Sequence, residues 1–375
     1  MIFALSGARI FDGTSFHTGK AVVIGGKRIV TLCPESSVDP EIPVVRLAGG
    51  LLAPGFIDVQ VNGGGGALLN DHPSIAVVRT IANSHRRFGT TGLLPTVITD
   101  RPEVTAAAIA AVREARREGI DNVLGIHVEG PFLDPARKGA HDPGLIRSIS
   151  PEDVALLAAA DCGEMMLTLA PNKVSPEVIG QLVAAGIHVS LGHSDASHEI
   201  VRAALDAGAS SFTHLFNAMS QMTGREPGMV GTALADERSY IGIIADGLHV
   251  HDLSLKLALK AASANRIMLV TDAMPPAAGG PDTFKLQGRE VMRVGGRLQL
   301  ADGTLAGSNL TMDEALRHAV NRLSVPLEAA LRMASFNPAC FLKRDDLGRI
   351  APGALASLVH LDDGLHVKQT WVEGQ

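Results

Sequence analysis

The chain has 375 residues, 46% hydrophobic and 3% aromatic, with a formal net charge of −6. This size allows a large buried core, and the acidic balance with few aromatics and no dense Lys/Arg run excludes a nucleic-acid-binding protein. Three widely separated cysteines with no CxxC pair predict a reducing compartment, the cytoplasm, and no disulfide framework. We expect neither a signal peptide nor a membrane-spanning segment.

Both ends of the chain show short β-type runs separated by glycine turns. The runs lie at 4–5, 8–10, 21–24, 28–32, 44–47, 357–361 and 366–372. Neither group is long enough to form a stable sheet alone. We therefore predict that residues 1–52 and 353–375 pair into one small β-sandwich domain. Two separate frayed termini are the alternative.

The middle of the chain, residues 53–352, alternates strand-like and helical patterns. Eight apolar runs occur, at 51–60, 92–98, 123–129, 165–170, 188–193, 211–216, 240–246 and 267–272. Amphipathic helical patterns at 103–118, 195–208 and 252–265 lie between some of them. Strands that alternate with helices indicate a parallel sheet, and eight such units predict a (β/α)8 TIM-like barrel. A doubly wound open sheet is the alternative.

Two other segments interrupt this alternation. Residues 283–303 are predicted to form a β-hairpin, which is either a lid or wall beside a site or a plain surface excursion. The glycine-rich stretch at 62–66 matches neither GxGxxG nor a P-loop, which disfavours a nucleotide cofactor and a Rossmann-type oxidoreductase.

Polar residues gather where the predicted strands end. Glu129 and His193 end the third and fifth runs, and His214 lies near the end of the sixth. Catalytic groups of such a barrel lie at the carboxyl ends of its strands. One carboxylate and two imidazoles are typical of a catalytic zinc site with a position open to water. We therefore predict a metal centre here. The alternative is three separately satisfied polar residues.

Asp272 ends the eighth run and suits an acid/base role. An ionised Asp beside a metal site can accept a proton from water and return it to a leaving group. The alternative is a structural Asp that caps the turn at 273–276.

Three further segments could contact a substrate. His141 and His249 follow the third and seventh strands and could bind a substrate oxygen or cap a helix. Arg225 lies in a loop, where it could bind a phosphate or carboxylate or remain a solvated surface residue. The loop 304–308 could bind a ligand through its backbone N–H groups.

Taken together, these residues resemble the amidohydrolase superfamily and, within it, the N-acetylglucosamine-6-phosphate deacetylases. The resemblance covers nearly the whole chain, in the family's order. It runs through Pro54-Gly55-Phe56-Ile57-Asp58, His127-Val128-Glu129-Gly130-Pro131-Phe132, Leu191-Gly192-His193-Ser194, Thr213-His214-Leu215-Phe216-Asn217-Ala218-Met219, Gly224-Arg225-Glu226-Pro227-Gly228, Ala245-Asp246-Gly247-Leu248-His249-Val250, Val270-Thr271-Asp272-Ala273 and Gly303-Thr304-Leu305-Ala306-Gly307-Ser308.

The resemblance implies a role for each of these groups. Glu129, His193 and His214 would bind the metal, and Asp272 would be the acid/base. Substrate contacts are implied for Ala140, His141, Asn217, Ala218, Arg225, His249, Leu305, Ala306 and Gly307. The family implies a homodimer, in which Arg225 and His249 would reach the substrate phosphate of the neighbouring subunit.

One departure from the superfamily bears on the metal count. Most amidohydrolases carry His-x-His at the end of the first strand and bind two metals, whereas this chain has Gln60 and Asn62. Neutral amides bind transition metals more weakly than imidazole does. We therefore expect one divalent metal per subunit, zinc first, with iron, cobalt or manganese as alternatives. A weak second metal near Gln60 and Asn62 remains open.

The expected reaction is hydrolysis of the acetamide of N-acetylglucosamine 6-phosphate to glucosamine 6-phosphate and acetate. The first rival is another amidohydrolase, which would act on N-acyl amino acids or cyclic amides. The second rival, a non-catalytic sugar-phosphate binder, is disfavoured because the ligand set and Asp272 are both present.

Overall fold

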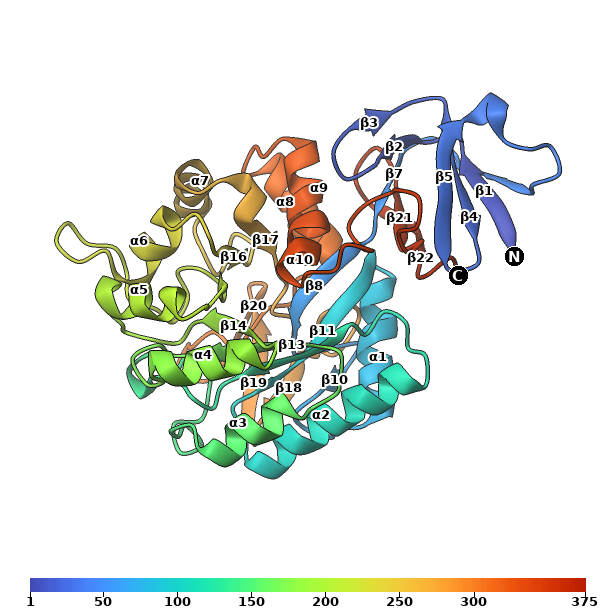
Figure 1. Cartoon of the computed structure of the whole chain (residues 1–375). Coiled ribbons are helices and arrows are strands. Elements are labelled where there is room, and N and C mark those ends of the chain that lie inside the picture. Colours follow the sequence, from blue (N-terminus) through green and yellow to red (C-terminus); the bar gives the residue numbers. More distant parts are fainter.

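Eight parallel strands form the central sheet of the computed structural model, which describes all residues, 1–375. They follow one another in chain order around the sheet (Figure 1). Each is buried along nearly its whole length, which explains their continuous apolar runs. The strands are β8 (Phe56–Val61), β11 (Thr90–Ile98), β12 (Gly125–Glu129), β13 (Glu164–Leu169), β14 (His188–Leu191), β15 (Ser211–Phe212), β16 (Tyr240–Ile243) and β17 (Ile267–Leu269).

The barrel closes between the first strand, β8, and the segment that follows the last, β17. The Asp272 N–H donates to Gln60 O at 3.0 Å. Two residues earlier in β8, Asp58 accepts a hydrogen bond from the Thr271 hydroxyl at 2.5 Å. Burial raises the pKa of Asp58 to about 7, because the carboxyl group has no water around it. The predicted (β/α)8 barrel is confirmed.

Helices follow most strands and cover the outside of the barrel (Figure 1). The apolar face of α2 is buried through Ala108, Val112 and Ala115, as its 3.6-residue pattern predicts. No helix is long and apolar enough to cross a membrane. The helices are α1 (Ile75–Arg86), α2 (Pro102–Arg117), α3 (Pro151–Ala158), α4 (Pro176–Ala184), α5 (His198–Asp206), α6 (Gly228–Ala235), α7 (Asp252–Ala261), α8 (Met312–Asn321), α9 (Leu327–Ala334), α10 (Phe336–Phe341), and the 3-10 turns η1 (Glu35–Ser37), η2 (Pro135–Arg137) and η3 (Ala264–Arg266).

Two further sheets lie to one side of the barrel, with both termini (Figure 1); the first has N-terminal strands only, and the second combines strands from both chain ends. One has the order β5-β4-β1-β6 and the other β22-β21-β7-β2-β3. Leu5, Ile24, Leu52, Leu358 and Trp371 are part of their common core. The strands are β1 (Ile2–Ser6), β2 (Arg9–Phe11), β3 (Phe16–His17), β4 (Lys20–Gly25), β5 (Arg28–Pro34), β6 (Val44–Arg46), β7 (Leu51–Pro54), β21 (Leu358–Leu361) and β22 (Val367–Trp371).

The apolar run at 51–60 is two strands rather than one. The first, β7, pairs with β21 of the terminal sheet, and the second, β8, pairs with β11 of the barrel. Gly55 joins them at a point with no room for a side chain, since a Cβ there would lie 2.1 Å from the Thr91 hydroxyl. The predicted boundary at residue 52 falls inside β7, and the domain limits of 52 and 353 stay a prediction.

The predicted hairpin at 283–303 is a three-stranded sheet. It comprises β18 (Thr283–Leu286), β19 (Arg289–Val294) and β20 (Arg297–Gln299), because the chain also turns at Gln287 and Gly288. Leu286, Val291 and Leu298 share a buried cluster with Ile98 and Met274 at the ends of barrel strands. This hairpin sheet is therefore a packed wall at the carboxyl edge of the barrel. A short pair at that edge is β9 (Gly63–Gly64) with β10 (Ala67–Leu68).

Candidate metal centre and active site

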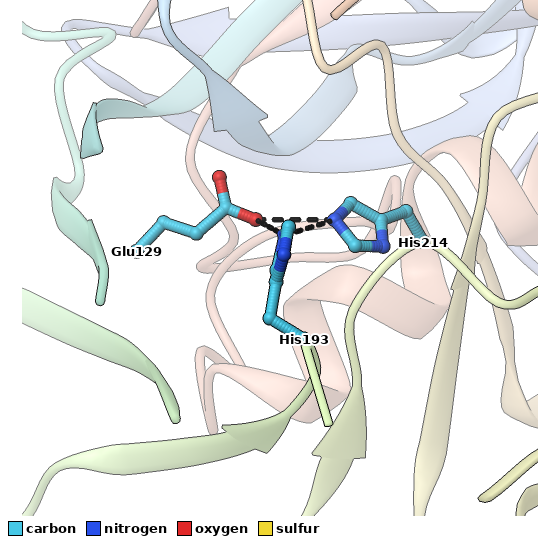
Figure 2. A group of neighbouring side chains, drawn as sticks. All are labelled: Glu129, His193 and His214. Carbon is cyan, nitrogen blue, oxygen red and sulfur yellow. Dashed lines mark hydrogen bonds and ion pairs between the residues drawn. The ribbon is translucent and has the colours of Figure 1, made fainter. Parts of the chain in front are cut away.

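Three side chains converge where β12, β14 and β15 end. Glu129 is the last residue of β12, and His193 and His214 each lie two residues beyond their strands. The Nε2 atoms of His193 and His214 lie 3.2 and 3.1 Å from Glu129 Oε1, and 3.1 Å from each other. Figure 2 shows the carboxylate and both rings pointing at one spot. The structure thus brings the three predicted ligands together.

The donor set fits a divalent metal ion. The Nδ1 of His193 donates to the Arg137 carbonyl at 2.9 Å, which leaves a lone pair on Nε2 facing Glu129. Ligand atoms bound at about 2.0–2.1 Å to a tetrahedral ion lie roughly 3.3 Å apart, close to the separations of 3.1–3.2 Å here. Two imidazoles and a carboxylate are typical zinc ligands.

Backbone strain coincides with the functional side chains. His193, His214 and Asp272 have φ angles of +47°, +32° and +51°, in the left-handed region that non-glycine residues seldom adopt. Such a conformation costs about 1–3 kcal/mol per residue and tends to occur at functional sites. Each of these three residues lies just beyond a barrel strand, where the backbone turns sharply and directs the side chain over the carboxyl end of the barrel.

The charges of the site are set by burial and by neighbouring groups. Burial alone would raise the pKa of Glu129, but the adjacent imidazoles of His193 and His214 outweigh it and hold the pKa well below its ordinary value. For Asp272, removal of water and the nearby Glu129 charge raise the pKa from 3.8 to about 6. A bound cation opposes this rise, so Asp272 is ready to accept a proton near neutral pH.

The two amides that replace the usual histidines hold Asp272. Asn62 Nδ2 and Gln60 Nε2 donate to Asp272 Oδ1 at 2.7 and 3.2 Å. Gln60 Nε2 also lies 3.3 Å from both oxygens of Glu129. Asp272 Oδ2 has no hydrogen-bond partner in the protein and is free to exchange a proton.

A cavity of about 510 Å³ opens over these groups. Ala306 does not line it, because its side chain is buried against the hairpin sheet and its backbone N–H donates to the Leu298 carbonyl at 3.0 Å. The predicted residues that do line the cavity are Glu129, Ala140, His141, His193, His214, Asn217, Ala218, His249, Asp272, Leu305 and Gly307.

His141 is buried beside the metal ligands. Its ring meets that of His193 edge-on, with centroids 4.5 Å apart, and its Nδ1 lies 2.8 Å from the Thr99 hydroxyl. Burial, helped by His193, lowers the pKa of His141 to about 3, so the ring is neutral. A neutral imidazole in this place can donate one hydrogen bond into the cavity.

His249 lines the cavity, as predicted for a substrate contact. Its Nδ1 contacts Asp246 Oδ2 at 2.7 Å, and its backbone N–H donates to Asp246 Oδ1 at 2.9 Å. This turn holds the ring at the cavity of its own chain. The contact of His249 with the phosphate of a neighbouring subunit stays a prediction. Hydrogen bonds and the nearby His249 outweigh burial and lower the pKa of Asp246, which keeps the carboxylate ionised.

Arg225, like Ala306, is a predicted site residue that does not line the cavity. It is exposed within the loop 221–227, and its side chain makes no hydrogen bond or ion pair. Nothing in its own chain uses this cation.

Three cavity neighbours were missed from the sequence. Arg137 and Lys138 line the cavity from the loop after β12, and Thr99 supports His141 from the end of β11. Thr99 could have been found, because it follows a barrel strand as the other site residues do. Arg137 and Lys138 lie in a loop without periodicity, which carries no such signal.

Comparison with known proteins agrees with this geometry. Residues 51–375 match the amidohydrolase family, and residues 2–52 match the NagA composite domain. An N-acetylgalactosamine-6-phosphate deacetylase from Shewanella sp. (strain ANA-3) is 47% identical over 99% of this chain and 93% of its own length.

Solved structures agree as well. An N-acetylglucosamine-6-phosphate deacetylase from Pasteurella multocida is 36% identical, with a TM-score of 0.96 over 100% of this chain and 99% of its own. A mutant of the Mycobacterium smegmatis deacetylase in complex with N-acetyl-D-glucosamine-6-phosphate is 31% identical, with a TM-score of 0.92 over 100% and 98%. The chain therefore belongs to the amidohydrolase family and, within it, to the N-acetylglucosamine-6-phosphate deacetylase group that its motifs resemble.

Proposed function

We propose that this enzyme hydrolyses the acetamide of N-acetylglucosamine 6-phosphate, with one divalent metal ion per chain, to give glucosamine 6-phosphate and acetate. The observation that carries the proposal is the meeting of Glu129, His193 and His214 with Asp272 at one cavity. Full-length relatives with deacetylase names support the choice of substrate.

The metal would be held by Glu129, His193 and His214, and zinc is the proposed ion. When bound, it polarises an amide carbonyl and makes water more acidic. Two imidazoles with one carboxylate favour zinc, although iron, cobalt and manganese accept the same ligands. Metal analysis of protein purified without added metal tests the assignment. A content other than one equivalent of zinc per chain would contradict it.

Proton movement is assigned to Asp272. Its Oδ2 takes a proton from the water whose oxygen attacks the acetyl carbon, and delivers that proton to the sugar nitrogen as the C–N bond breaks. Gln60 and Asn62 hold Oδ1, so the same oxygen faces the cavity throughout. His141 donates to the acyl oxygen as negative charge develops on it.

The sugar-phosphate end is assigned to the outer part of the cavity. Asn217, Ala218 and the Leu305–Gly307 loop would contact the sugar, and His249, oriented by Asp246, would contact the phosphate. We propose that the enzyme is a homodimer in which Arg225 reaches the phosphate in the neighbouring subunit, since no group of its own chain engages it. A monomeric mass at assay concentrations would contradict this assembly.

A second candidate substrate is N-acetylgalactosamine 6-phosphate. The Shewanella relative with that name shares 47% of its residues with this chain over nearly its whole length. The two sugars differ only in the configuration of one hydroxyl. The metal centre and Asp272 are assigned to the acetamide, which both sugars carry.

The deciding experiment measures acetate release. The purified enzyme is given both N-acetylhexosamine 6-phosphates, both free sugars, an N-acyl amino acid and a cyclic amide. We expect a much higher kcat/KM for the phosphorylated sugars, and a higher value for the glucosamine derivative than for its epimer. Turnover confined to N-acyl amino acids or cyclic amides would assign the chain to another amidohydrolase activity. Binding of a sugar phosphate without acetate release would identify the protein as a non-catalytic sugar-phosphate binder.

Replacing Arg225 with Gln should reduce the preference for phosphorylated sugar. We expect kcat/KM for the 6-phosphate to fall about 10–100-fold, mostly through KM, because a charge-assisted contact is lost. Activity on the free sugar should not change. The control is Arg322→Gln, an exposed arginine that does not line the cavity. An equal loss on both sugars would remove Arg225 from phosphate recognition.

We propose that the enzyme works in the cytoplasm. Its three cysteines, Cys33, Cys162 and Cys340, are unpaired, as is usual in a reducing compartment. Activity recovered mainly outside the cytosolic fraction of lysed cells would contradict this location.

A further inference from the structure

Thr99 is a buried hydroxyl that lies directly behind His141. It follows the last residue of β11 and is 1% exposed, and its Oγ1 lies 2.8 Å from His141 Nδ1. The site is built closely around this hydroxyl. Gly130, the residue after Glu129, has φ +84°, and a Cβ at that position would lie 2.2 Å from Thr99 Oγ1. The backbone beside the metal ligand therefore leaves room for the Thr99 side chain.

The hairpin sheet holds both members of this pair. Gln287 Nε2 donates to the Thr99 carbonyl at 2.6 Å, and Arg289 Nη2 donates to the Ala140 carbonyl, next to His141, at 2.6 Å. Gln287 lies in the turn between β18 and β19, and Arg289 is the first residue of β19. One rigid element thus fixes the spacing between the hydroxyl and the imidazole.

The direction of the Thr99–His141 hydrogen bond decides what His141 can do. A neutral imidazole has one N–H and one lone pair, and a hydroxyl has one proton to donate. The Thr99 proton has two possible acceptors: His141 Nδ1 at 2.8 Å and the Glu129 carbonyl at 3.5 Å. The shorter contact is well inside the normal range and the longer one lies at its limit. Donation from Thr99 to Nδ1 is therefore the arrangement that gives the Thr99 proton a well-placed acceptor.

This direction places the only ring proton of His141 on Nε2. His141 Nε2 has no hydrogen-bond partner in the protein, and the residue lines the cavity. In the opposite tautomer Nδ1 would donate to Thr99, and Nε2 would present a lone pair that repels a developing oxyanion. Tautomer choice is a known role of the group behind a catalytic imidazole.

We propose that Thr99 is a positioning residue that fixes His141 in the tautomer with Nε2–H directed at the acyl oxygen of the substrate. The proposal rests on the deacetylation proposed above, because it assigns the support of one group in that reaction.

The kinetic test compares two substitutions of Thr99. Thr99→Val keeps the shape and removes the hydroxyl, and Thr99→Ser keeps the hydroxyl. We expect Thr99→Val to lower kcat about tenfold or more with little change in KM, because the missing hydrogen bond acts mainly in the transition state. Thr99→Ser should retain at least half of the activity. Equal losses in the two variants would indicate packing alone and overturn the proposal.

A double-mutant cycle separates a direct effect from one that acts through His141. In an enzyme with His141→Asn, the further change Thr99→Val should have no additional effect on kcat, since the group it orients is gone. A full additional loss in that background would show that Thr99 acts elsewhere. Thermal unfolding of each variant confirms that the fold is kept.

A spectroscopic measurement tests the inference without turnover. The ¹⁵N shifts of the His141 ring, assigned by their loss in His141→Gln, should show a protonated Nε2 in the parent and in Thr99→Ser. Thr99→Val should show a mixture of tautomers. If the parent releases no acetate, the proposed function fails while this measurement still decides the tautomer. If acetate is released but His141 has the same tautomer in all three proteins, only the role of Thr99 fails.

Discussion

Replacing Asp272 with Asn is expected to lower kcat by about a thousandfold or more and to leave the metal content unchanged. The Oδ2 of this carboxylate is the oxygen left to accept a proton, since Oδ1 is occupied by Gln60 and Asn62. An amide has the same shape but cannot accept a proton. Because the three metal ligands are other residues, the ion should remain bound.

The substitution is well matched to its site. The new amide oxygen can occupy the place of Oδ1 and keep both hydrogen bonds, so the loss should reflect proton transfer rather than folding. Asp206→Asn is a suitable control, because this exposed carboxylate pairs with Arg238 outside the cavity. Acetate release and metal content are measured on the same samples. Activity within tenfold of the parent would assign the acid/base role to another group.

The acid limb of the pH profile should report the same residue. Asp272 must be deprotonated to accept a proton, so kcat/KM should fall as the pH drops through its pKa. That pKa is raised to about 6 by desolvation and by Glu129, and the bound cation moves it lower. We therefore expect the limb at or below about pH 6. It should be absent from the residual activity of Asp272→Asn.

The strand-end residues were the most predictable part of the site. Neighbouring parallel strands present their carboxyl ends at one edge, so Glu129, His193 and His214 had to lie near each other once the barrel was inferred. The same rule brings His249 to the cavity but does not give the direction of its ring. Its ring direction depends on a local turn that is closed by hydrogen bonds to Asp246.

Contacts between distant segments were beyond the reach of sequence patterns. Gln60 and Asp272 are 212 residues apart, and Thr99 and His141 are 42 residues apart. The absence of histidines at 60 and 62 was visible in the sequence, but the use of the amides to hold Asp272 was not. His127 shows that closeness in sequence to a site residue does not place a side chain in the site. It is two residues from Glu129, yet its Nε2 contacts the Thr168 hydroxyl at 2.7 Å within the barrel.

Changing Gln60 and Asn62 to His together is expected to raise the metal content from one to two ions per chain. The amide nitrogens of these residues already lie within 2.7–3.3 Å of oxygens of Asp272 and Glu129. Two imidazoles in their place would provide, with those carboxylates, a second set of nitrogen and oxygen ligands. The single changes Gln60→His and Asn62→His are the matched controls and should stay at one ion.

Turnover of the double variant should fall even though metal is gained. Asp272 loses both amide donors, and a second cation beside it lowers its pKa and makes it a weaker base. We expect kcat to drop about tenfold or more and the acid limb of the pH profile to move lower. Metal content is measured after equilibration with excess zinc and removal of unbound ions. A content of one ion, with the fold intact, would mean that the two positions do not define a metal site, and that Gln60 and Asn62 are present for Asp272 alone.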